Sequence, residues 1–87
     1  MWTELLPAMA GGTLIDHDAP DEPTEIVEAK LEGEPPSERI MIVGKDFSWM
    51  SLRQYAGVRV ENGELEIATT FGQSCTVKLP ARTEAKR

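Results

Sequence analysis

Apolar and polar residues alternate most clearly over residues 58–67, where two short runs flank the dipeptide Asn62-Gly63. Asn-Gly between alternating runs is typical of a two-residue hairpin turn, because a type I′ turn needs positive φ at both central positions. Pairing outward from this turn places Arg59 opposite Glu66 on the face that water would cover. The apolar side chains on the opposite face would be Val58, Val60, Leu65 and Ile67. The pattern therefore predicts a hairpin with one buried face.

Further segments have the pattern of strands. Residues 25–32 alternate well, although residues 28–32 would also suit a helix. Residues 40–43 are a continuous apolar run, which suits a central strand covered on both faces. Residues 75–79 alternate up to a proline, and residues 13–16 suit a brief strand. The apolar face of the first of these strands would consist of Val27, Ala29 and Leu31.

Two segments favour helical structure. Residues 3–10 suit one or two helical turns, with Thr3 as the N-cap and Gly11-Gly12 as the stop. Near residues 48–56, apolar side chains recur at i, i+3 and i+7, and a glycine follows. The same stretch also alternates as a strand would, so an extended conformation is the alternative. We expect the helix.

The fold class that follows is α+β and mostly β. We expect a small antiparallel sheet of four to five strands, with one short helix near 48–56 and a short N-terminal helical turn. A sheet of this length could close into an SH3-like or Sm-like barrel, a comparison that concerns the fold and not the function. The 87 residues suit a single domain over residues 1–80, with an acidic loop at 16–24 and a flexible charged tail at 81–87.

Charge is unevenly spread along the chain. Residues 1–38 carry ten acidic residues and one basic residue, whereas residues 39–87 carry eight basic and five acidic residues. The net charges of −9 and +3 add up to −6. One interpretation is an acidic half that is solvated and partly neutralised by the basic half. The other is an acidic face that meets a basic protein surface.

Several partner classes are disfavoured by composition. No basic cluster exists outside the C-terminal tail, so we expect no direct nucleic-acid binding. No apolar run approaches the roughly 18 residues that a membrane span needs, and the acidic start does not suit a signal peptide. A single cysteine, Cys75, excludes an internal disulfide. We therefore expect a cytoplasmic protein.

Residue types that carry chemistry are present but scattered. His17 lies among the carboxylates of the acidic loop, yet a metal site normally needs a second ligand-bearing element, so we expect no metal and no cofactor. Cys75 suits a buried structural role, because His17 is the only candidate base. Ser74 and Ser51 have no better claim to a catalytic triad. We expect no enzyme.

The function expected from these observations is a non-catalytic acidic interaction module that binds and modulates or inhibits a larger protein. Small acidic proteins of this class include phage- and mobile-element-encoded inhibitors of host machinery. Aromatic and arginine side chains often anchor interfaces, which adds the segment around Arg53 to the acidic positions. The candidate partner-binding residues are Glu25, Glu28, Glu32, Glu34, Trp49, Arg53 and Tyr55.

Two other classes of function remain open. One is a barrel that binds a small, nucleotide-like ligand near Gly72-Gln73-Ser74. The other is a structural subunit of a homo-oligomer or virion that associates through strand edges.

Overall fold

A seven-stranded sheet forms most of the structure, a computed structural model that describes residues 1–81. The elements in chain order are α1 (Trp2–Leu5), η1 (Leu6–Met9), β1 (Thr13–Asp16), β2 (Thr24–Glu32), β3 (Arg39–Gly44), β4 (Ser48–Leu52), η2 (Arg53–Tyr55), β5 (Ala56–Glu61), β6 (Glu64–Thr69) and β7 (Ser74–Lys78). The elements η1 and η2 are 3-10 turns. Among residues 1–81, no helix has the length and apolar character to cross a membrane.

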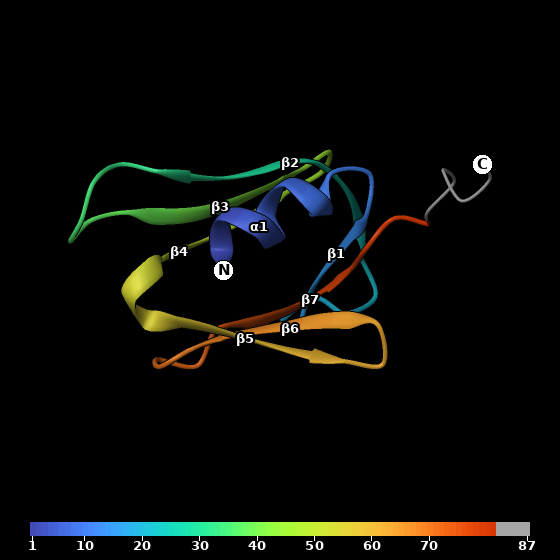
Figure 1. The fold of residues 1–87 in the computed structure, drawn as a ribbon. Helices are drawn as coiled ribbons and strands as arrows, with labels where there is room; N and C mark the ends of the chain where they lie inside the picture. Colours follow the sequence, from blue (N-terminus) through green and yellow to red (C-terminus); the bar gives the residue numbers. More distant parts are fainter. Residues whose placement is uncertain (82–87) are drawn as a thin grey trace.

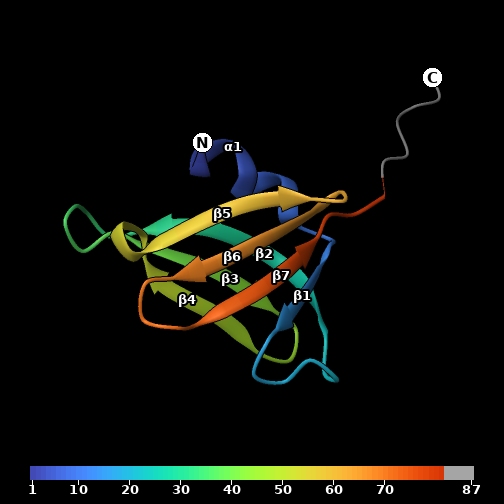
Figure 2. The same ribbon diagram turned by 90° about the horizontal axis from the view of Figure 1, so that it is seen from below.

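The sheet bends into two layers (Figure 1). Its strand order is β4-β3-β2-β1-β7-β6-β5, and every neighbouring pair is antiparallel. One layer holds β2, β3 and β4, and the other holds β1, β7, β6 and β5, as Figure 2 also shows. The mostly β, antiparallel prediction is confirmed. The predicted four to five strands are too few, and the sheet does not close into a barrel, because β4 and β5 remain its two edges.

A register shift in β2 lets one strand serve both layers. The start of β2 pairs with β1 and the rest pairs with β3, with the shift between Ile26 and Glu28. The extra residue, Val27, is 54% exposed, so its predicted place on the buried face is wrong. Beyond the bulge, Ala29 and Leu31 pair with residues of β3 and pack against the core as predicted. A bulge bends a strand in this way because it adds one unpaired residue.

The predicted helix at 48–56 is wrong. Ser48–Leu52 is the edge strand β4, and only Arg53–Tyr55 is helical, as the 3-10 turn η2. Trp49 and Ser51 are buried, whereas Met50 between them is 51% exposed. With this alternation, β4 pairs with β3 along its whole length. The backbone hydrogen bonds of this pairing outweigh the helical spacing of apolar residues, which extends over only two turns.

The predicted hairpin and its register are confirmed, but the predicted place of Val60 on the buried face is wrong, because this residue near the turn is 66% exposed. Val60 pairs with Leu65 and Arg59 pairs with Glu66 around the turn. Asn62 and Gly63 both have positive φ, at 55° and 80°, as a type I′ turn requires. Strand β3 also lies between two strands as predicted, but only one of its faces is fully covered, because Ile40 and Ile42 are buried whereas Met41 and Val43 are half-buried.

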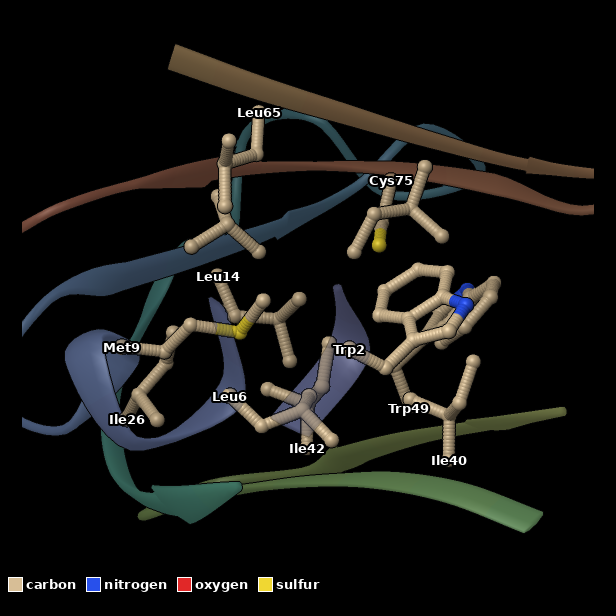
Figure 3. Close-up of a cluster of buried hydrophobic side chains, with 12 residues drawn as sticks. Trp2, Leu6, Met9, Leu14, Ile26, Ile40, Ile42, Trp49, Leu65 and Cys75 are labelled. Atoms are coloured by element: carbon tan, nitrogen blue, oxygen red, sulfur yellow. The ribbon is translucent and has the colours of Figure 1, made fainter. Parts of the chain in front are cut away.

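The N-terminal segment completes the core. Trp2, Leu6 and Met9 are at most 3% exposed. Figure 3 shows these side chains between the two layers, with Leu65 on one side and Ile42 on the other. The predicted helical turn is confirmed, but the predicted cap is not, because the N-cap residue is Met1 and makes no side-chain hydrogen bond.

Candidate partner-binding surface at the loop end

Three connecting segments gather at one end of the molecule, which we call the loop end (Figure 1). They are the β2–β3 loop (residues 33–38), η2 and the β6–β7 turn (residues 70–73). The Gln54 Nε2 group donates to the Pro36 carbonyl oxygen at 3.3 Å, and the Thr70 backbone N–H donates to the Tyr55 carbonyl oxygen at 3.0 Å. The loop end is therefore tied together across both layers.

An exposed aromatic pair lies at the loop end. The rings of Tyr55 and Phe71 meet edge to face, with centroids 5.9 Å apart and planes at 78°. Tyr55 is 42% exposed and Phe71 is 59% exposed. The edge-to-face arrangement is favourable because the positive edge of one ring meets the negative face of the other. The pair thus presents a large apolar area in a fixed geometry.

A polar hollow adjoins this end. The guanidinium Nη1 of Arg53 lies 2.7 Å from Glu38 Oε1, and the Arg53 backbone N–H donates to the Glu38 carbonyl oxygen at 2.9 Å. The hollow beside this ion pair has a volume of about 250 Å³. It is lined by Pro35, Pro36, Glu38, Arg53 and Gln54.

The predicted partner-binding residues fall into two groups. Glu34, Arg53 and Tyr55 belong to segments of the loop end. Glu25, Glu28 and Glu32 lie along β2, each with one of the protein's own cations within 4.0 Å: Lys45 for Glu25, Lys30 for Glu28, and Lys30 and Arg39 for Glu32. The outer face of β2 is therefore a ladder of ion pairs and not an uncompensated acidic surface.

Trp49 does not contribute to either group. Its side chain is 4% exposed and packs in the core between the two layers (Figure 3). Phe71 is absent from the partner-binding residues predicted from sequence; it lies in the β6–β7 turn and completes the aromatic pair. The adjacent Gly72 is the signal in the sequence for this turn, and its φ of 99° is one that glycine adopts readily.

The β1–β2 loop, and not β2, carries acidic residues that are not paired within residues 1–81. Within residues 1–81 every Lys and Arg lies within 4.0 Å of a carboxylate. Acidic residues without such a partner in this range include Asp18, Asp21 and Glu22, all in the exposed β1–β2 loop. No group of three or more His, Cys, Asp or Glu side chains in the described part of the chain could hold a metal ion.

The one cysteine lies inside the core. Cys75 faces inward from β7 and is fully buried. Burial above all, and then the nearby carboxylates of Asp16 and Glu66, together raise the pKa of the Cys75 thiol to about 12. The thiolate that nucleophilic chemistry needs is thereby disfavoured.

No protein-family profile, no curated protein and no solved structure matches this chain.

Proposed function

We propose that the protein is an interaction module that binds a larger protein through the loop end and modulates or inhibits it. The observation that supports this proposal most directly is the exposed Tyr55–Phe71 pair. Aromatic side chains with an adjacent arginine are typical anchors of protein interfaces, because they bury much area at a small cost in conformational entropy.

The loop end has further features of an interface. Arg53 and Gln54 precede Tyr55 in η2 and line a hollow together with Pro35 and Pro36, which can receive a partner side chain. Backbone and side-chain hydrogen bonds hold the loops in place before binding. Binding therefore requires little ordering of the loops, and this preorganisation favours affinity.

Net charge suits a partner with a basic surface. The chain carries −6 at pH 7, and the carboxylates of the β1–β2 loop lack internal cations within residues 1–81. Because the acids of β2 are already paired, we assign charge a role in attracting the partner and the aromatic pair the role of holding it. Association should then slow as salt rises, whereas dissociation should change little.

The experiment is a pull-down from lysate at low and high salt with three tagged proteins, followed by identification of the bound proteins by mass spectrometry. The three are the unchanged protein, the double variant Tyr55→Ser/Phe71→Ser and the control Val60→Ser. Val60 is 66% exposed and lies on β5 near the hairpin turn, away from η2. We expect one stoichiometric partner that the control retains and the double variant loses.

Melting temperatures of all three proteins are measured first, so that a loss of binding is compared only between folded proteins. Equal capture by the double variant would overturn the loop end as the binding surface. If capture of the partner is the same at both salt concentrations, the charge contribution is wrong even where the aromatic contribution stands.

A second candidate function, self-association, is favoured by one specific observation. The edge strand β4, residues Ser48–Leu52, carries no charged residue and no proline, and its Met50 is exposed. Natural edge strands usually carry charged residues or a proline, which prevent pairing with another chain. Sedimentation at rising concentration tests this candidate: a dimer that Met50→Lys dissolves would support it, and a monomer at millimolar concentration would exclude it.

A further inference from the structure

A chain of hydrogen bonds crosses the outer face of the layer that contains β1, β7 and β6. The His17 ring lies between two hydroxyls of β7, with Nδ1 2.7 Å from Ser74 Oγ and Nε2 2.7 Å from Thr76 Oγ1. The Thr76 hydroxyl donates to Glu66 Oε2 on β6 at 2.9 Å. The His17 backbone N–H also donates to the Ser74 carbonyl oxygen at 3.2 Å, which fixes the residue at the end of β1.

The direction of each hydrogen bond follows from the carboxylate. An ionised Glu66 can only accept, so the single Thr76 hydroxyl proton is used on it. Thr76 Oγ1 must then accept from an N–H at His17 Nε2. In a neutral imidazole the other nitrogen, Nδ1, carries the lone pair, and the Ser74 hydroxyl donates to it. The Ser74 proton is therefore directed at a base whose tautomer is fixed by a carboxylate.

A hollow lies beside Ala68, the residue of β6 that pairs with this serine. Ala68 on β6 pairs with Ser74 on one side and with Gly57 on the other, so the positions beside Ser74 have little or no side chain. A Cβ added to Gly57 would meet nothing within 4 Å. The resulting hollow has a volume of about 410 Å³ and is lined by Gly57, Val58, Arg59, Glu66 and Ala68. Ser74 and Thr76 share this outer face with Ala68 and Glu66.

We propose that Ser74 is a histidine-activated modification site that takes an acyl group from an activated ester. The physical basis is that a serine hydroxyl is weakly nucleophilic unless an adjacent base, itself held by a third group, accepts its proton. Here the base is His17 and the orienting groups are Thr76 and Glu66. The hollow over Gly57 and Ala68 receives the acyl chain.

The step balances as an acyl transfer. Ser74 Oγ forms a bond to the acyl carbon while its proton passes to His17 Nδ1. The bond from the acyl carbon to the leaving oxygen then breaks, and the proton moves from Nδ1 to the leaving alcohol. The products are an ester on Ser74 and a free alcohol, with the imidazole returned to its neutral form.

Sequence reasoning missed this site because its members are far apart in the chain. Ser74 follows His17 by 57 residues, and only the pairing of β1 with β7 brings them together. The carboxylates beside His17 indicated a solvated acidic loop. The Asp16 carboxylate accepts a local hydrogen bond, from the Asp18 backbone N–H to Asp16 Oδ1 at 2.9 Å.

The test exposes the protein to p-nitrophenyl acetate and p-nitrophenyl butyrate and maps the adducts by peptide mass spectrometry. Ser48, which is exposed on β4 with no imidazole beside it, is the matched reference within the same chain. We expect acylation of Ser74 about 100-fold faster than of Ser48, the lower range of general-base assistance. His17→Gln, which keeps a hydrogen-bonding side chain without the base, should remove this advantage.

Equal rates at Ser74 and Ser48, or an unchanged rate in folded His17→Gln, would overturn the proposal. Ala68→Leu should lower the rate with the butyrate ester more than with the acetate ester, because it fills the hollow. If the ratio of the butyrate rate to the acetate rate is the same in Ala68→Leu and in the unchanged protein, the hollow does not receive the acyl chain.

Thr76 and Glu66 act as positioning residues, and the test of that role is spectroscopic. His17 is the only histidine, so its two ring nitrogens can be assigned directly by ¹⁵N NMR. We expect the Nε2–H tautomer in the unchanged protein and in Thr76→Ser, and a mixture of tautomers with slower acylation in Thr76→Val. A predominant Nδ1–H tautomer in the unchanged protein would contradict the proposed direction of the chain.

Discussion

Arg53 and Glu38 are joined twice, by an ion pair of 2.7 Å and by a backbone hydrogen bond of 2.9 Å. This double link connects η2 with the β2–β3 loop and so determines the shape of the loop end. Because both side chains are partly exposed, solvent screens the ion pair, and we expect Arg53→Ala to cost about 0.5–1 kcal/mol. A double-mutant cycle with Glu38→Ala measures this coupling, and a coupling of zero would show that the ion pair adds nothing to stability.

The N-terminal segment should be indispensable to folding. Trp2 is 3% exposed and packs among the buried side chains of both layers. We expect Trp2→Ala to lower the free energy of unfolding by about 3–5 kcal/mol, the usual cost of removing a buried aromatic side chain. Denaturant unfolding measures this change. A loss below about 0.5 kcal/mol, as is usual for a surface substitution, would contradict this packing of Trp2.

Cys75 should make stability fall at high pH. Its pKa is raised from 9.0 to about 12, by burial first and then by Asp16 and Glu66. Between these values the unfolded chain releases the thiol proton and the folded chain keeps it, so stability falls by up to about 1.4 kcal/mol per pH unit. The measurement is the pH dependence of unfolding relative to Cys75→Ala, which lacks the thiol.

A constant difference in stability between the two proteins from pH 8 to pH 11 would contradict the raised pKa. The same burial predicts that a thiol reagent labels Cys75 only at the rate of unfolding.

Replacement by alanine should have different effects on stability at two glycines. A Cβ on Gly44 would lie 2.4 Å from Thr24 Cγ2 and 2.5 Å from the Phe47 carbonyl oxygen, so the backbone must shift. We expect Gly44→Ala to cost about 1–3 kcal/mol, as overpacking does. Gly57→Ala is the matched control, because open space surrounds that position, and it should be neutral or slightly stabilising. Thermal unfolding of both variants checks the contrast.

The local parts of the fold could be predicted from sequence. The hairpin at Asn62-Gly63 follows from turn chemistry and alternation within ten residues, and its register is correct. The strand at Ser48–Leu52 could not be predicted in the same way. Its apolar residues fit both the alternation of a strand and the spacing of a helix, and only pairing with the free edge of β3 decides between the two. The bulge at Val27 likewise depends on β2 pairing with both β1 and β3.

The candidate site was predictable to a similar extent. Arg53 and Tyr55 were found from residue type alone, since aromatic and arginine side chains anchor interfaces. Phe71 was missed, because its contact with Tyr55 spans 16 residues and depends on η2 meeting the β6–β7 turn. The neutral charge ladder on β2 was also hidden, because the cations that pair with its acids come partly from residues after the loop, such as Arg39 and Lys45.

The most direct test of the loop end is photo-crosslinking in cells. A photoreactive phenylalanine analogue is placed at position 71 in one protein and at position 60 in another, since both positions are strongly exposed. We expect position 71 to form a covalent adduct of defined mass with one partner and position 60 to form none. Adducts with the same partner at position 60 but not at position 71 would contradict the assignment of the binding surface to the loop end.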